Sequence, residues 1–294
     1  MTSVAVIAHS GKSLGGGLPE LRSILDMSGV TDPMWFEVPK SKKAPKRVRK
    51  ALADGADLVF VWGGDGMVQQ CIDVLAGSDA ILAIIPAGTA NLFATNLGIP
   101  KDLTAAVELG LHGDRRKFDV GVINGEHFAV MAGAGFDAVM IRDADGEMKD
   151  RFGRVAYLWT GAKHLRAKRV GTRVRVDGDT WFDGDTSCVL VGNVGKVMGD
   201  IAAFPDAHPD DGVLEVGIVT ARGAWQWART LAHMARGRAK SSPFVRTTRG
   251  KAIDVRFSKK VTYELDGGDR KPRARLRIKV KPSAITVCVP APGA

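Results

Sequence analysis

Four short apolar runs alternate with helix-compatible segments in the first third of this 294-residue sequence. The apolar runs cover residues 3–8, 34–38, 57–63 and 80–86, with helix-compatible segments near 18–28, 44–54 and 67–76. Continuously apolar strands that are separated by helices are typical of a parallel sheet covered on both faces. We therefore predict a doubly wound α/β domain, in which ligands bind at the carboxyl ends of the strands.

The pattern changes after about residue 118, where short strand-like segments are separated by turns that contain Gly, Asp or Asn. This pattern of short strands and turns predicts an antiparallel β-sandwich. Helix patterns at 154–169 and 223–239 interrupt it, and their apolar stripes favour packing in a core over contact with a membrane. We predict a first domain at 1–117 and a second at 118–294, whose last residues could return to the first domain.

Composition excludes several classes of protein. Of the residues, 45% are hydrophobic and 25% charged, which is typical of a soluble globular protein, and no apolar run is long enough to span a membrane. No basic segment precedes the first apolar stretch, so we expect no secretory signal. The three cysteines are far apart, which argues against disulfides and a zinc site and favours the cytoplasm.

Positive charge is concentrated in one block of this chain, whose net charge is +10. Residues 39–50 contain no acid, and their basic residues are Lys40, Lys42, Lys43, Lys46, Arg47, Arg49 and Lys50. Such a block can bind nucleic acid, anionic lipid or nucleotide phosphates. It can equally be a solvated helix face, and the sequence leaves both interpretations open.

Three glycines surround one carboxylate where the third apolar run ends, in Gly63-Gly64-Asp65-Gly66. Glycines let the main chain approach a polyphosphate closely, and the amides at the start of a helix can bind an anion. Asp65 would repel phosphate unless Mg²⁺ lay between them, and Mg²⁺ commonly binds one or two carboxylates and several waters. Taken alone, the tetrapeptide could also be a tight turn whose Asp caps the helix.

Two further loops end neighbouring strands of the predicted sheet. Residues 86–91, PAGTAN, follow the fourth apolar run, and residues 9–13, HSGKS, follow the first without the spacing of a Walker A motif. All three loops would open on the same edge of a parallel sheet. This convergence favours a phosphate site over three unrelated turns.

An ordered series of motifs runs through nearly the whole chain: GGDG, PAGTANLFATNLGIP, FDVG, GAGFDA, FPDAHPDDGVLEVGIV and YELDGG. In this order they resemble the diacylglycerol kinase catalytic family, the bacterial lipid kinases related to sphingosine and ceramide kinases. The resemblance implies a nucleotide domain, a β-sandwich lipid domain and an ATP site in the cleft between them. It implies Mg²⁺ and transfer of the γ-phosphate of ATP to a lipid hydroxyl, with diacylglycerol or a related lipid as acceptor.

Carried over residue by residue, the resemblance assigns the ATP phosphates to the glycine loops. The implied nucleotide-binding residues are Gly63, Gly64, Asp65, Gly66, Met67, Val68, Gln69, Gly88, Thr89 and Asn91. It also implies a Mg²⁺ site formed by the Asp211 carboxylate and the backbone oxygens of His208 and Val213, which are ligands that a hard cation accepts. Taken alone, residues 210–212 would be an Asp-Gly hairpin turn instead.

Three positions depart from the family pattern. Met67 replaces a threonine hydroxyl near the phosphates, and Leu92 replaces an aspartate that many members have. Gly268 replaces the glutamate that the resemblance assigns as proton acceptor. We therefore expect Asp266 to orient or deprotonate the acceptor hydroxyl, with Asp269 as its substitute.

Two other functions remain open. An NAD kinase also carries GGDG and phosphorylates a soluble hydroxyl, and a non-catalytic nucleotide or lipid sensor would explain the departures from the family pattern. Nucleic-acid binding ranks last, because no aromatic stacking platform or recognition motif accompanies the basic residues.

If the chain is the kinase, we expect Asp65 to face Mg·ATP and to be required for phosphoryl transfer. We also expect the protein to associate peripherally with anionic membranes, and a homodimer is left open. The docking residues would be the block 39–50 and a second cluster of Arg166, Lys168, Arg169 and Arg173.

Overall fold

A computed structural model describes residues 3–135, 169–198 and 201–291. The chain divides into two compact units, residues 1–120 with 281–294 and residues 121–280. Nearly all of the helix predicted at 154–169 lies outside the described residues, as do Arg166 and Lys168 of the second basic cluster.

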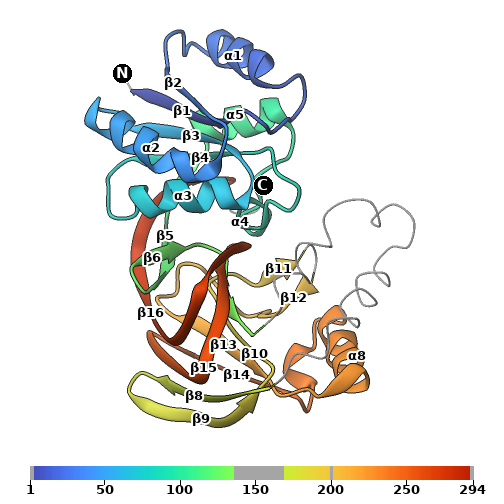
Figure 1. Ribbon diagram of the computed structural model, residues 1–294. Coiled ribbons are helices and arrows are strands. Elements are labelled where there is room, and N and C mark those ends of the chain that lie inside the picture. The colour runs from blue at the N-terminus through green and yellow to red at the C-terminus, as the bar shows by residue number, and fades with distance from the viewer. Residues whose placement is uncertain (1–2, 136–168, 199–200, 292–294) are drawn as a thin grey trace. The chain divides into compact units, whose positions relative to one another are not determined.

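The first unit contains a parallel sheet in the order β16-β4-β3-β1-β2 (Figure 1). Its strands are β1 (Val4–His9), β2 (Met34–Val38), β3 (Leu58–Gly63), β4 (Ile81–Pro86) and the end of β16 (Gly268–Val289). Its helices are α1 (Leu18–Met27), α2 (Ala44–Ala53), α3 (Asp65–Leu75), α4 (Leu92–Asn96) and α5 (Leu103–His112), and β5 (Asp114–Ile123) leads out of it.

Helices cover both faces of this sheet, which confirms the doubly wound fold. Alternate strand residues, including Phe60 and Trp62, form a buried cluster with α1 and α5. Helices α2 and α3 pack against each other and against β1 and β3. Because both faces are covered, the strands are apolar throughout, which is the pattern that the sequence shows.

The second unit is the predicted antiparallel sandwich. One layer has the order β14-β13-β10-β7-β15-β16, and β15 pairs along its first half with β8, which pairs with β9. The strands are β6 (Glu126–Phe128), β7 (Met131–Ala134), β8 (Val170–Val176), β9 (Asp179–Thr186), β10 (Cys188–Gly192), β11 (Lys196–Met198), β12 (Ile201–Ala202), β13 (Leu214–Val219), β14 (Val245–Gly250) and β15 (Ala252–Leu265). The helix predicted at 223–239 is α8 (Gly223–Ala235), followed by a 3₁₀ turn at Ala239–Ser241.

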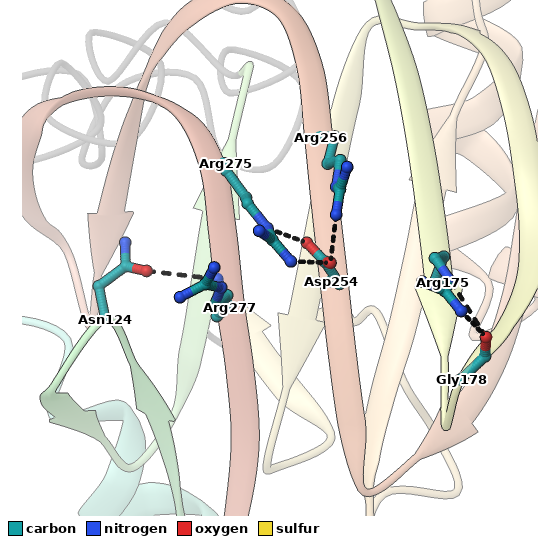
Figure 2. A network of polar contacts seen from close by, with 7 residues as sticks. All are labelled: Asn124, Arg175, Gly178, Asp254, Arg256, Arg275 and Arg277. Atoms are coloured by element: carbon teal, nitrogen blue, oxygen red, sulfur yellow. Dashed lines mark hydrogen bonds and ion pairs between the residues drawn. The ribbon is translucent and has the colours of Figure 1, made fainter.

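Side chains alternate along these strands between a buried core and the outer face. Ile253, Val255 and Leu276 lie in the core cluster. On the outer face, Figure 2 shows Arg275 and Arg256 both directed at Asp254. Arg256 and Arg275 are direct cross-strand partners, so the carboxylate offsets a repulsion between like charges. The hydrogen bond from Arg275 lowers the pKa of Asp254.

The packing of α5 on the sheet leads to a stability prediction for Gly110. A Cβ atom added there would lie 2.3 Å from a ring carbon of Phe60 and 2.9 Å from the Cβ of Ala83. Helix propensity alone predicts that Gly110→Ala stabilises by about 1 kcal/mol. We expect instead a loss of roughly 1–3 kcal/mol in the free energy of unfolding, because the methyl group overpacks the core.

Urea denaturation of the wild type, Gly110→Ala, Phe60→Leu and the double variant measures this effect. The double variant should lose less free energy of unfolding than the two single variants lose together, because a smaller side chain at position 60 makes room for the methyl group. Additive losses, or a more stable Gly110→Ala, would contradict the close packing.

Candidate active site

Two glycine loops touch through their backbones where β3 and β4 end. These strands are neighbours, with Gly63 opposite Pro86. A Cβ atom added to Gly88 would lie 2.3 Å from the Cα of Gly64, and one added to Gly64 would lie 3.1 Å from the Cα of Gly88. The first distance leaves no room for a side chain and the second is tight, so the sequence needs glycine at this contact.

The start of α3 leaves backbone amides available for a ligand. The amides of Met67 and Val68 donate to the carbonyl oxygen of Gly64, at 2.8 and 3.1 Å. Within the described residues, no protein acceptor pairs with the amides of Gly64 and Gly66. Unpaired amides at the positive end of a helix dipole can bind an anion. A Cβ added to Gly66 would meet no atom within 4 Å, so the main chain there is open to a ligand.

Asn91 fixes the shape of the second loop. Its backbone is left-handed, with φ of 50°, and its side chain is buried. Its Oδ1 accepts from the amide of Gly88 at 2.9 Å, and its Nδ2 donates to the carbonyls of Pro86 and Gly88 at 3.1 and 2.6 Å. Asn91 therefore supports the loop with its side chain, whereas Thr89 in the same loop is exposed.

Asp65 links the two loops. It is the first residue of α3, and its Oδ1 accepts a hydrogen bond from the backbone amide of Phe93 in the first turn of α4, at 3.3 Å. Burial raises the pKa of Asp65, while backbone hydrogen bonds from Phe93, Leu92 and Asn91 act against this rise. Asp65 thus caps α4 rather than α3, whose N-cap is Gly64.

The loop after β1 lies at the same edge of the sheet. The indole Nε1 of Trp62 donates to the carbonyl of Lys12 at 3.2 Å. A Cβ added to Gly63 would lie 3.8 Å from the Cβ of His9. Three strand-end loops therefore meet at the carboxyl edge, where a doubly wound sheet binds its ligands.

Three predicted nucleotide-binding residues can reach a ligand only through their backbone. The side chains of Met67, Val68 and Gln69 are 1%, 4% and 2% exposed. Position 67 therefore carries a buried apolar side chain and offers no hydroxyl group to a ligand.

The predicted Mg²⁺ ligands lie in a turn of the second unit. The amide of Asp211 donates to the carbonyl of His208 at 3.4 Å, and Asp211 Oδ1 accepts from the amide of Val213 at 3.1 Å. No three His, Cys, Asp or Glu side chains of the described residues gather to hold a metal. One carboxylate with two carbonyl oxygens fits a Mg²⁺ ion that keeps several of its waters.

Asp266 holds the start of β7. It follows β15 with a left-handed backbone, φ 46°, and is 7% exposed. Its carboxylate accepts three backbone hydrogen bonds, from Ala129 at 2.8 Å and from Val130 and Met131 at 2.9 Å. Asp269 is exposed on the next strand, directly opposite Glu264.

Sequence reasoning missed Glu264. This residue is 6% exposed, and burial, followed by the charges of Asp269 and Asp266, raises its pKa to about 7. An acidic residue between Tyr263 and Leu265, which are both buried, was the available signal. A buried carboxylate with a shifted pKa is a candidate for acid–base chemistry.

The glycine contact leads to a prediction with a matched control. Gly88→Ala should separate the two loops, weaken ATP binding at least tenfold and lower the melting temperature by several degrees, because the new methyl group would occupy the position of Gly64. Gly66→Ala should leave the melting temperature unchanged or raised, since space is open there. Calorimetric ATP titration measures the affinity of both variants, and thermal denaturation measures their melting temperatures. Equal melting temperatures of Gly88→Ala and Gly66→Ala would contradict the backbone contact.

Two family models match the chain. The diacylglycerol kinase catalytic domain matches residues 3–123, and the YegS C-terminal NAD kinase beta sandwich-like domain matches residues 130–289. A Pseudomonas aeruginosa protein named "Probable lipid kinase YegS-like" is 33% identical over 84% of this chain and 82% of its own length. A Bacillus subtilis diacylglycerol kinase is 30% identical over 72% of this chain and 71% of its own length.

Solved structures have the same fold. A diacylglycerol kinase from Bacillus anthracis superposes with a TM-score of 0.73 at 21% identity, over 99% of this chain and 97% of that one. An NAD kinase from Archaeoglobus fulgidus in complex with ATP has a TM-score of 0.53 at 11% identity, over 98% and 93%. With both domains matched in order, and with relatives of at least 30% identity over most of its length, the chain belongs to the diacylglycerol kinase catalytic family.

Proposed function

We propose that the chain is an ATP-dependent lipid kinase that transfers the γ-phosphate to a lipid hydroxyl, with diacylglycerol or a related lipid as acceptor. Membership of the family supports kinase chemistry on a lipid. The observation that carries the proposal is the backbone contact between Gly64 and Gly88 beside the free amides of α3. A bare main chain with unpaired amides suits a polyphosphate better than it suits an uncharged ligand.

Catalysis in such a kinase consists mostly of positioning and charge neutralisation. The amides of Gly64 and Gly66 would hold phosphate oxygens, with Gly63 and Gly88 letting the main chain come close and the Thr89 hydroxyl adding a donor. Mg²⁺ bound with ATP would neutralise phosphate charge. The carboxylate of Asp65 could hold it at the glycine loops, and the turn of Asp211 in the second unit offers a separate set of oxygen ligands for a divalent cation.

Asp65 has two roles in this proposal, and they can be separated. Asp65→Asn removes the charge that would hold Mg·ATP but keeps an oxygen that can accept from the Phe93 amide. We therefore expect transfer to fall by at least 100-fold, with a melting temperature close to that of the wild type. Asp65→Ala should lose both the activity and part of the stability, because it leaves the α4 amides without their cap.

Steady-state transfer rates and thermal denaturation of the two variants separate these roles. Full activity in Asp65→Asn would contradict the contact with Mg·ATP. Equal stability of the Asn and Ala variants would contradict the capping role.

An acceptor panel tests the function as a whole. The full chain is incubated with Mg·ATP labelled at the γ-phosphate and, separately, with diacylglycerol, sphingosine, ceramide, NAD and water. We expect label in a lipid product. Label only in NAD would establish the alternative of an NAD kinase, and ATP binding without transfer to any acceptor would establish a nucleotide sensor.

Membrane association would bring this enzyme to its substrate. Helix α2 buries Ala44, Val48 and Ala51. The basic block 39–50, which begins before this helix and continues into it, is exposed, and its exposed cations are Lys40, Lys42, Lys43, Lys46, Arg47, Arg49 and Lys50. Among the described residues, Lys50 is the member of the block that forms an ion pair, with Asp54 at 2.8 Å. No helix in the described part of the chain has the length and apolar character needed to cross a bilayer.

We therefore predict electrostatic docking through this block. Replacing Lys42, Lys43, Lys46 and Arg47 by Gln should weaken binding to vesicles of anionic phospholipid by about 10²- to 10³-fold at low salt, at roughly 1 kcal/mol for each charge. Salt should weaken the wild type in the same way. Sedimentation with vesicles at several salt concentrations measures both effects.

A matched control removes four charges from the second unit, at Lys259, Lys260, Lys271 and Arg273, all of which are exposed. An equal loss in this control would show that net charge, rather than the block, controls binding. Binding that salt does not weaken, but that Trp225→Ala abolishes, would show apolar insertion instead, since Trp225 is 80% exposed on α8.

A further inference from the structure

Five arginines surround one aspartate on the outer face of strands β8, β15 and β16. The cross-strand partners form two adjacent rows, with Arg173, Arg256 and Arg275 in one row and Arg175, Asp254 and Arg277 in the other. Val174, Val255 and Leu276, which alternate with them, lie in the core cluster, so all six side chains leave the sheet on its outer face. We call these five arginines the arginine cluster. Their strand positions span about 10 Å by 7 Å.

Carboxylates of the protein offset only part of this charge. Asp254 accepts two hydrogen bonds from Arg275, at 2.8 and 2.5 Å, and lies 3.5 Å from Arg256. At the edge of the cluster, Arg173 pairs with Asp183 of β9 at 2.7 Å. Arg256 is thus the weaker of the two partners of Asp254, and its side chain is 51% exposed.

Arg175 and Arg277 contact no carboxylate within the described residues. Arg175 donates to the backbone carbonyl of Gly178, as Figure 2 shows. The described contacts of Arg277 involve its backbone, which pairs with Asn124, and its side chain is exposed. The cluster therefore keeps donors and positive charge that the described part of the protein does not use.

The arrangement of the cluster opposes the stability of the sheet. Like charges that lie directly opposite one another destabilise a pair of strands, and Arg256 has an arginine on both sides. Strands favour β-branched and aromatic residues instead. Packing of the second unit therefore does not explain five arginines here, whereas an anionic ligand that relieves their repulsion does.

The chemistry of the cluster favours phosphate that carries more than one charge. Each guanidinium group is a planar fork that can donate two parallel hydrogen bonds to phosphate oxygens. Five arginines and Asp254 leave an excess of four positive charges over an area that covers only one or two lipid headgroups. A phosphate monoester has three terminal oxygens and about 1.5 to 2 negative charges at neutral pH, so it matches this charge density better than a diester with one charge.

The shape of the face favours a ligand that is presented in a plane. A depression of about 450 Å³ lies toward β9, but its acidic and basic lining residues are equal in number: Asp183, Asp185, Arg173 and Arg256. Arg175 and Arg277, which have no carboxylate partner, lie outside it. No exposed aromatic side chain of the described residues lies on these three strands, so the face lacks a stacking platform for nucleotide bases.

We propose that the arginine cluster binds the headgroups of phosphate monoester lipids at a membrane surface. Such lipids are the class of product that the proposed function forms, so the choice of lipid rests on that function. The cluster adds selectivity for the headgroup to the general attraction that the block 39–50 exerts on anionic membranes. Docking through it strengthens where the phosphorylated lipid accumulates.

Sedimentation of the full chain with two kinds of phosphatidylcholine vesicle tests this proposal. One contains phosphatidate, a monoester, and the other contains enough phosphatidylglycerol, a diester, to give the same zeta potential. The wild type should bind the phosphatidate vesicles about tenfold more tightly, because each fork gains a charge-assisted contact. The cluster variant Arg175→Gln/Arg256→Gln/Arg277→Gln should lose this preference and about 10²-fold in affinity for phosphatidate, at roughly 1 kcal/mol for each charge.

Two further variants separate the cluster from net charge and from folding. The matched control replaces three exposed arginines of the same unit by Gln, at Arg222, Arg229 and Arg238, and should keep the preference for phosphatidate. Arg277→Gln alone removes a side chain without a described contact, so it should keep the wild-type melting temperature and lose about fivefold in affinity for phosphatidate.

Several outcomes would overturn the proposal. These are equal binding of the wild type to both kinds of vesicle, and an equal loss in the cluster variant and the matched control. Displacement from phosphatidate vesicles by micromolar glycerol 3-phosphate would show a site for a free phosphate ester instead. Tighter binding of single-stranded RNA, lost in the cluster variant, would show a nucleic-acid face. Absence of phosphoryl transfer to every lipid would overturn the proposed function but would leave these binding measurements unchanged.

Discussion

The contact between the main chains of Gly64 and Gly88 is the constraint on which the candidate site depends. Two neighbouring parallel strands end at the same edge, and their loops come so close that a methyl group on Gly88 would reach the Cα of Gly64. Asn91 shapes one loop and Asp65 joins it to the other. The amides at the start of α3 are thereby held in place without a side chain between them and a ligand.

Much of the first unit follows from its sequence because burial on both sides of a parallel sheet leaves a clear pattern. The apolar runs that end at residues 8, 38, 63 and 86 correspond to β1, β2, β3 and β4. The meeting of their loops also follows, since parallel strands end at one edge. The sandwich was predictable as a class, but the pairing of β15 with three other strands was not, because it depends on contacts far apart in the sequence.

Individual side-chain roles were harder to predict than the fold. The motif LDGG directed attention to Asp266, yet the partners of that carboxylate are amides at residues 129–131, more than 130 positions earlier. Glu264 carries no motif, and its environment arises only when β7, β10 and β16 assemble around it. Asn91 similarly looks like a ligand in the sequence, although the structure uses its amide group to hold its own loop.

Strand β16 has a consequence for the order in which the protein forms. This strand is 22 residues long; its first half pairs with β15, and Thr286 and Val287 near its end pair with β4 in the first unit. During synthesis from the N-terminus, β4 emerges some 200 residues before the strand that covers its edge. Until then, the apolar edge of β4 can pair with another chain. The α/β unit is thus completed only after the sandwich strands have been synthesised, which links the maturation of the candidate phosphate site to the end of β16.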